Sequence, residues 1–189
     1  MLLTRFNRSV FEVIKILVMS VLCCEICVAQ DMDIDKTSSD QHKIIYQPVN
    51  IEITTHLGDQ QVFVEKDIIS FFINLNKASF VYVFYQDVSG AVYQLMPGNA
   101  QLDNYFKPGF YIPFPSKESL FQFVVQAPFG KEQLWIFASD KGGLKFYNKG
   151  SVQGLNELNL NYIELTRYIK KRSSKVFGKN TLIINTRGK

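Results

Sequence analysis

Apolar and polar residues alternate along the chain from Val49 onward, which is the pattern of a half-buried β-strand. Val49, Ile51 and Ile53 would share one face of a first strand, and the turn residues Gly58 and Asp59 would end it. Further short runs follow that are rich in β-branched and aromatic residues, as strands are. These runs cover residues 68–75, 80–85, 91–96, 111–112, 120–125 and 134–138.

The connections between these runs also favour strands. Residues 87–90 read Asp-Val-Ser-Gly, which suits a four-residue hairpin turn because glycine can adopt a positive φ. Prolines and glycines within 97–98, 108–109, 113–115 and 128–130 would interrupt a helix. We therefore predict a mainly β fold, either an antiparallel β-sandwich or a partly closed barrel.

The periodicity changes near the C-terminus. Apolar residues recur there at intervals of three and four, which places them on one face of a helix. They are Leu155, Leu158, Tyr162, Leu165 and Ile169. We predict an amphipathic C-terminal helix near 155–172 that packs on the sheet, and Gly178 should end this segment. Residues 181–186 should form a final strand that pairs with the sheet, since an exposed strand of this kind would aggregate.

Residues 1–29 have the order of a secretory signal peptide. The apolar run 16–24 follows three basic residues, and a small-x-small site at 27–29 precedes a polar segment. We expect cleavage after this site, so that the mature protein begins at or near Gln30. The protein would then be periplasmic, associated with the outer membrane, or secreted.

Two other interpretations of the N-terminus stay open. An uncleaved membrane anchor needs about 20 apolar residues. The run here is shorter and Glu25 interrupts its far end, so a charged side chain would lie in lipid. Lipid attachment at Cys24 would need a small residue before it, and this chain has Cys23 there.

The mature chain would contain 160 residues and no cysteine, because Cys23, Cys24 and Cys27 all lie in the signal peptide. It would therefore hold no disulfide, thiolate metal site or cysteine nucleophile. We expect a flexible leader at 30–47, a single β-rich domain at 48–189 and no transmembrane helix in the mature chain.

Charge is distributed unevenly along the chain. Residues 167–189 contain eight basic residues and no acidic one, whereas residues 30–166 contain ten basic and fifteen acidic residues. Such asymmetry favours an acidic partner, here an envelope protein or an anionic envelope surface rather than nucleic acid, which an exported protein rarely meets. A solvated helix end is the alternative. The candidate interaction residues are Lys170, Lys171, Arg172 and Lys175.

The middle of the chain carries a recognisable order of residues: a strand at 80–90, the segment 92–97, and a later strand at 134–139 that includes Trp135. With turn residues between them, these segments resemble an uncharacterised bacterial family known only as a domain of unknown function. Members of that family are exported or are joined to caspase-like peptidases and protein kinases. The resemblance covers about 49–139 and implies a β-rich module without catalytic residues. Its motif residues are Gly90, Leu95, Pro97, Asn99, Asn104, Gly109, Pro113 and Gly130.

Motifs for catalysis or cofactor binding are missing from the sequence. It contains no Gly-x-Ser-x-Gly, phosphate-binding glycine loop or dinucleotide fingerprint. His42 and His56 stand alone. Aspartates alternate over 31–35 as in a calcium loop, but Lys36 stands where that loop needs glycine and His42 where it needs glutamate. We expect no catalytic residue, no bound metal and no cofactor.

The function these features favour is that of a non-catalytic interaction or assembly module of a bacterial envelope, such as a subunit of a secretion machine that spans it. The first alternative is a module that binds glycan or peptide through exposed aromatic residues. A less favoured alternative is a hydrolase that uses two carboxylates. The aromatic candidates are Phe80, Tyr82, Phe84, Tyr85 and Tyr93. Because strand side chains alternate between faces, only one set could form a binding platform, and core packing is the simpler explanation. We also expect that Trp135 or Phe137 is largely buried.

Overall fold

The computed structural model describes residues 46–119, 121–152 and 154–189. The expected signal peptide at 1–29, almost all of the leader, His42 and the aspartates at 31–35 lie outside the described residues. The described part is mainly β with one C-terminal helix and a final strand, as the sequence predicts.

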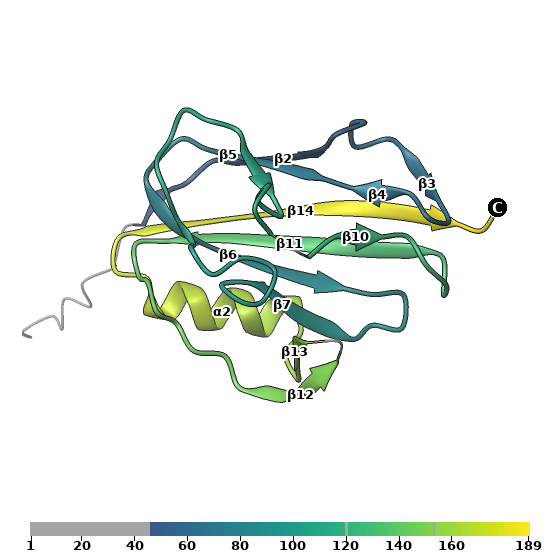
Figure 1. Ribbon diagram of the computed structural model, residues 1–189. Coiled ribbons are helices and arrows are strands. Elements are labelled where there is room, and N and C mark those ends of the chain that lie inside the picture. Colours follow the sequence, from purple (N-terminus) through teal and green to yellow (C-terminus); the bar gives the residue numbers. More distant parts are fainter. Residues whose placement is uncertain (1–45, 120, 153) are drawn as a thin grey trace, which may run out of the picture. The chain divides into compact units, whose positions relative to one another are not determined.

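Nine strands form one large sheet (Figure 1). Seven lie side by side in the order β1 (Gln47–Pro48), β14 (Val176–Arg187), β11 (Lys131–Ser139), β6 (Ser79–Gln86), β7 (Val92–Met96), β13 (Leu155–Leu158) and β12 (Asn148–Val152). In addition, β3 (Val62–Val64) pairs with β14 and β8 (Tyr105–Phe106) pairs with β6. β14 is long enough to pair with β1 near its start and with β3 near its end, both in parallel. The sheet is therefore mixed rather than wholly antiparallel as we expected.

Two smaller sheets complete the β-structure. One contains β2 (Ile51–Thr55), β5 (Phe71–Leu75) and β9 (Ile112–Phe114); the other pairs β4 (Ile68–Ile69) with β10 (Phe123–Val124). Figure 1 shows β2 and β5 lying above β14 and β11. Alternate residues of the central strands, such as Val83 and Ile136, form one core with the inner faces of the smaller sheets, which include Phe71 and Ile73. The structure is thus a sandwich, one of the two arrangements that the sequence predicts.

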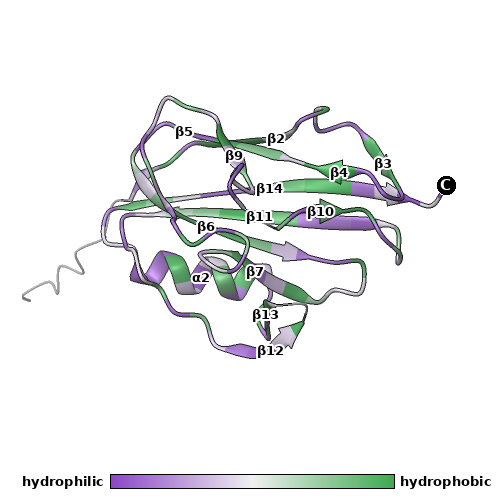
Figure 2. Ribbon diagram, in the orientation of Figure 1, coloured by the Kyte–Doolittle hydropathy of each residue, from purple (hydrophilic) through white to green (hydrophobic). Residues whose placement is uncertain are grey.

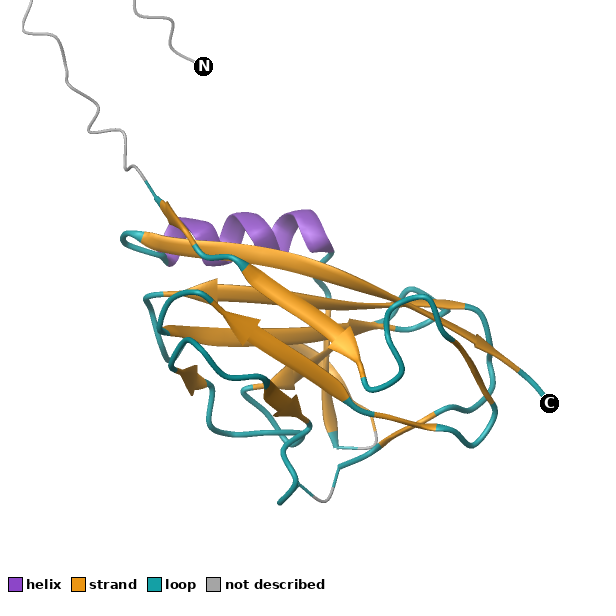
Figure 3. Cartoon of the chain, turned by 90° about the horizontal axis from the view of Figure 1, so that it is seen from above, coloured by secondary structure: helices purple, strands orange, loops and turns teal. Residues whose placement is uncertain are grey.

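A second core lies on the opposite face of the large sheet, under α2 (Tyr162–Arg172). The intervening residues of the central strands, including Phe84, Trp135 and Phe137, pack there against Leu165 and Ile169 of the helix. Figure 3 shows α2 running along one side of the strands, and Figure 2 shows apolar bands alternating with polar ones along it. Trp135 is 3% and Phe137 0% exposed, so the expected burial is confirmed for both side chains.

The prediction that the helix begins near residue 155 is wrong. Residues 155–158 form β13, which pairs with β7. The helix begins at Tyr162 because Asn161 caps its N-terminus. The Asn161 side chain accepts a hydrogen bond from the backbone N–H of Glu164, and the Glu164 carboxylate accepts one from the backbone N–H of Asn161. The Asn-x-x-Glu spacing of this capping box was visible in the sequence, but the apolar stripe extended past it.

Gly178 does not end the C-terminal segment but lies inside β14. A Cβ atom at this position would overlap the carbonyl oxygen of Val49, so glycine is needed for the close approach of two backbones. The hairpin predicted at 87–90 is confirmed between β6 and β7, with Gly90 at φ 89°. The expected pairing of the final strand is confirmed as well, because β14 lies next to β11 over nine residue pairs.

Candidate functional site

A pocket with a volume of about 280 Å³ opens where several turns of the sandwich meet. Its walls come from the β6–β7 hairpin, β10 and the segment after it, the first residues of β11, and the β12–β13 hairpin. Figure 1 places this region at the end of the sandwich that carries the β6–β7 hairpin. The volume lies near the lower limit of ligand pockets, roughly 300–1,000 Å³. A single side chain or head group would fill it.

Aromatic rings form one wall of the pocket. Tyr85 of β6 and Tyr93 of β7 are directly opposite in the sheet, and their rings stack at 6.2 Å with an interplanar angle of 27°. Phe123 of β10 meets Tyr85 edge-on at 6.0 Å. Because Phe123 also packs on Phe71 in the sandwich core, this wall is a continuation of the core to the surface.

Three exposed valines line the pocket. Val88 is 37% exposed, Val124 39% and Val152 44%, and each comes from a different turn or strand end. Exposed apolar side chains are ordinary when scattered singly, but here they gather around a cavity. The surface at the mouth is therefore suited to contact with an apolar group.

Two carboxylates give the pocket its polarity. Gln133 of β11 pairs with Gln86 of β6, and continuing this antiparallel register by one residue places Glu132 opposite Asp87. Both residues line the pocket. Among the described residues, neither carboxylate forms a salt bridge. Like charges directly opposite each other on neighbouring strands are destabilising.

The two carboxylates differ in their surroundings. Asp87 accepts hydrogen bonds from the Ser89 hydroxyl at 2.6 Å, the Ala91 N–H at 2.9 Å and the Tyr93 hydroxyl at 3.4 Å. It therefore closes the hairpin turn, as aspartate often does. Glu132 is half-buried and has no comparable turn to stabilise.

Burial raises the pKa of Glu132 and of the two tyrosines in this pocket. It raises the pKa of Glu132, and the negative charge of Asp87 raises it further, whereas interactions with the hydroxyl groups of Tyr85 and Thr186 oppose the shift. Burial also raises the pKa of Tyr85 and Tyr93, and the nearby carboxylates add to both shifts. The ionised form of Glu132 would be favoured by a cation, and the described lining contains no basic residue.

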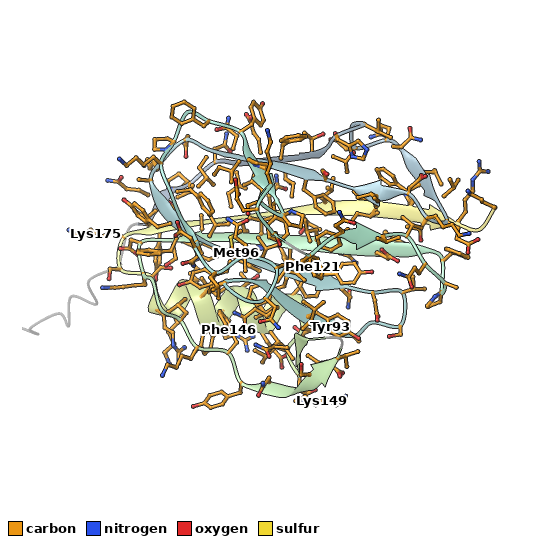
Figure 4. All side chains as sticks on the ribbon, in the orientation of Figure 1. Tyr93, Met96, Phe121, Phe146, Lys149 and Lys175 are labelled. Atoms are coloured by element: carbon orange, nitrogen blue, oxygen red, sulfur yellow. The ribbon has the colours of Figure 1, made fainter. Side chains whose placement is uncertain are left out.

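The structure places the predicted basic residues away from this pocket. Figure 4 shows Lys175 at one end of the sandwich and Tyr93 toward the other. Lys170, Lys171, Arg172 and Lys175 are all exposed. The Arg172 guanidinium lies 3.6 Å from the centre of the Tyr168 ring.

Asp140 lies at the basic end of the helix, although the sequence has no acidic residue nearby. Its carboxylate accepts the backbone N–H groups of Ser174 and Lys175 at 2.8 and 3.0 Å. The tertiary structure thus brings one acidic residue to the cluster, where it binds backbone rather than side chains.

None of the predicted motif residues lines the pocket. They lie in turns or loops, in strands or in the buried core. The Asn104 side chain donates to the carbonyl oxygen of Val81 at 3.1 Å, and Asn99 donates to that of Gly154. Leu95 is fully buried. Pro97 lies in the turn after β7, Gly109 lies between β8 and β9, and Pro113 lies in β9. Gly90 and Gly130 have positive φ angles. In these positions the motif residues contribute to turns, buried packing and backbone contacts.

The aromatic candidates divide between core and pocket. Tyr82 and Phe84 belong to the second core, and Phe80 packs against Tyr105 at 4.9 Å. Only Tyr85 and Tyr93 line the pocket. Strand alternation within β6 sends Tyr82 and Phe84 under the helix and Tyr85 toward the smaller sheets, which explains the division.

Sequence reasoning did not single out Asp87 and Glu132 as a pair. One signal was present: strand alternation puts Glu132 on the same face as Leu134 and Ile136, so an acidic residue occupies a core-facing position at the start of a strand. The pairing with Asp87 depends on the register between β6 and β11, whose facing ends, Gln86 and Lys131, are 45 residues apart, and the sequence does not show this register.

The sequence also bears on the histidines, a metal site and a membrane-spanning helix. His56 is exposed, and its Nδ1 atom accepts the N–H of Ser70 at 3.3 Å. Within residues 46–119, 121–152 and 154–189, no group of histidine, cysteine and acidic side chains could hold a metal ion. In the same residues, no helix has the length and apolar character needed to cross a membrane.

Comparison with known proteins gives one match. Residues 62–142 are similar to a family described as "Domain of unknown function (DUF4384)". This confirms the expected resemblance to an uncharacterised domain, over a segment from β3 to just beyond β11 that includes Tyr85, Asp87, Tyr93 and Glu132. The walls from the β12–β13 hairpin and β14 lie outside the matched segment. No curated protein and no solved structure matches the chain.

Proposed function

We propose that this chain is a non-catalytic interaction module that works outside the cytoplasm in a bacterial envelope, as part of an assembly such as a secretion machine. The observation that carries the proposal is the pocket formed by Tyr85, Tyr93, Asp87 and Glu132 with exposed valines at its mouth. An apolar rim around a small polar pocket is suited to hold one side chain of a protein partner. The signal peptide predicted at 1–29 and the exposed basic cluster support an extracytoplasmic role.

A binding role suits the carboxylates better than a catalytic one. Three hydrogen bonds from its own hairpin occupy Asp87, so this residue is held as a turn residue rather than presented as a nucleophile or base. Glu132 alone would leave the two-carboxylate mechanism of a glycosidase incomplete.

Site-specific photo-crosslinking in the native envelope would test the proposal. A photo-reactive residue at Val124, on the rim of the pocket, should form a discrete crosslink to one protein. The same residue at Ile163, which is 67% exposed on α2 and lies away from the pocket lining, is the matched control. Recovery of uncrosslinked monomer from both variants would contradict the proposed interaction. The intact mass of the mature protein should correspond to a start near Gln30; a retained Met1, or a diacylglycerol on Cys24, would contradict the predicted export.

A glycan-binding function is the second candidate, at a different site. On the outer face of the three-stranded sheet, the Glu52 carboxylate accepts from the Asn74 amide and the Tyr111 hydroxyl, each at 3.3 Å. Tyr111 is 60% and Phe110 74% exposed beside this group. Exposed aromatic rings next to amide and carboxylate groups could stack on and hydrogen-bond a sugar. Loss of binding on a glycan array in the Tyr111→Ala variant, with Tyr147→Ala as control, would support this candidate.

A further inference from the structure

We propose that the pocket between the β6–β7 hairpin and β10 receives a basic side chain, lysine or arginine, from a partner protein. This inference rests on the proposed interaction function and names the chemistry of the group that the pocket selects.

The first argument is the missing countercharge. The register of β6 with β11, continued by one residue, places Asp87, which directly follows β6 in the hairpin, opposite Glu132 of β11. Like charges directly opposite each other are destabilising. The residues lining the pocket include no lysine, arginine or histidine. From the nearby β12, Lys149 is already paired with Glu157 at 3.0 Å. The described structure thus keeps two acids together without a cation, an arrangement that a bound cation would relieve.

The second argument is the shape and polarity of the pocket wall. Lysine and arginine carry a charged head on an apolar stem, and such stems pack along apolar surfaces. The exposed side chains of Val88, Val124 and Val152 would contact the stem. Tyr85 and Tyr93 are less exposed, and the Tyr93 hydroxyl donates to the Asp87 carboxylate. Tyrosine rings also attract cations. Rim and interior together therefore match a basic side chain better than an apolar or an acidic one.

The third argument concerns the state of Glu132. Burial and the charge of Asp87 raise the pKa of Glu132, so the pocket favours the protonated form of Glu132 more than solvent does. A bound cation would favour the carboxylate instead. The other groups that act on this residue are the Asp87 carboxylate and the hydroxyls of Tyr85 and Thr186. Among these, only the two carboxyl groups carry a charge near neutral pH, so binding should strengthen as the pH rises through the pKa of Glu132.

Among the described residues, none that lines the pocket is basic, so we assign the basic group to another molecule. The exposed basic cluster at the end of α2 lies at the other end of the same sandwich, as the positions of Lys175 and Tyr93 in Figure 4 show. A second copy of this chain could present that cluster, but we commit to a separate partner protein. Self-association that disappears in the Lys171→Glu, Arg172→Glu double variant would overturn this part of the inference.

The experiment uses three matched probes on the mature protein. They are the N-acetyl, N′-methylamide derivatives of lysine, norleucine and glutamate, which share a backbone and differ in the charge at the end of the side chain. NMR titration should show saturable shifts of the amide signals of Asp87, Ala91 and Glu132 with the lysine probe. The norleucine and glutamate probes should bind at least about 10-fold more weakly, a difference of about 1.4 kcal/mol, because neither can form the charge pair with the carboxylates.

Variants then assign the effect to the carboxylates. Glu132→Gln and Asp87→Asn should each weaken binding of the lysine probe by about 10-fold or more. Glu118→Gln is the control, because this residue is exposed, carries the same charge and lies outside the pocket. The affinity of the lysine probe should also rise with pH in the wild type and not in Glu132→Gln.

The outcomes separate this inference from the function on which it rests. If norleucine binds as tightly as lysine and Glu132→Gln has no effect, the pocket binds a ligand but the choice of a basic side chain is wrong. If none of the probes gives saturable shifts at low ionic strength, the inference is also wrong. Crosslinking from Val124 decides the proposed function independently, because it requires no assumption about which side chain enters the pocket.

Discussion

The Phe137→Ala variant tests whether the second core anchors the C-terminal helix to the sheet. Phe137 is fully buried on the helix-facing side of β11. Its ring lies 5.9 Å from that of Phe84 and 5.7 Å from that of Tyr162, the first residue of α2. Truncation would therefore remove contacts within the sheet and between the sheet and the helix.

The expected loss is about 3 to 5 kcal/mol in the free energy of unfolding. Transfer of a phenylalanine side chain from water accounts for roughly 1.5 to 3 kcal/mol, and the rest comes from the cavity and the lost ring pairs. Because a domain of this size is stable by about 5 to 15 kcal/mol, the variant should still fold. If the free energy of unfolding falls by about 2 kcal/mol per molar urea, the urea concentration at the midpoint of unfolding should fall by roughly 2 M.

Urea denaturation followed by tryptophan fluorescence would measure the change, since Trp135 is the only tryptophan and lies in the same core. Circular dichroism on the same samples checks that strands and helix unfold together. Ile163→Ala is the control: this side chain is on α2 but 67% exposed, so its loss should cost within about 0.5 kcal/mol. A loss below about 1 kcal/mol for Phe137→Ala would show that the helix-facing side of β11 is not a packed core.

Further variants test the close backbone contact at Gly178, the state of Glu132 and the basic cluster at the end of α2. Gly178→Ala should lower the free energy of unfolding by about 1 to 3 kcal/mol, because the new methyl group would overlap a carbonyl oxygen of the β1–β2 connection. Gly150→Ala is the control, since a methyl group there would meet no atom within 4 Å. Equal losses for the two variants in thermal melts would refute this reasoning. The pKa of Glu132 is raised in the folded state above its ordinary value of 4.5. The contribution of Glu132 to stability is therefore fully present below pH 4.5 and is lost as the pH rises through the raised pKa. Glu132→Gln should therefore be more stable than the wild type at pH 7 and equal to it near pH 4, and the reverse order in melts at the two pH values would contradict the shift. The Lys171→Glu, Arg172→Glu double variant should bind an anionic partner more weakly than the wild type, and high salt should weaken the binding of the wild type. The double variant should lose no more than about 1 kcal/mol of stability, mainly because Arg172 no longer stacks on the Tyr168 ring. Binding that survives both changes would exclude this cluster as the contact surface.

The sequence by itself determined the mainly β character of the domain, most of its strands and the face that each strand residue occupies. These features depend on two-residue alternation and on turn residues, which act over a few neighbouring positions. Alternation alone put Phe84 and Val83 on opposite faces of one strand, and Phe137 and Ile136 on opposite faces of another. That Phe84 and Phe137 share a face was decided by the pairing of β6 with β11. The start of the helix was also encoded locally, in the capping box at Asn161 and Glu164, although the apolar stripe that overlapped it suggested an earlier start.

Only the tertiary structure decided the features that depend on pairing between distant strands. Leu155 and Leu158 became part of a strand because the edge of β7 was available to pair with them. Gly178 is needed because another backbone passes against it, not because a segment ends there. The pocket depends in the same way on the register of β6 with β11, which brings Asp87 opposite Glu132. Such registers are chosen by the packing of the whole sandwich, since shifting one strand by a single residue would turn its buried face to solvent.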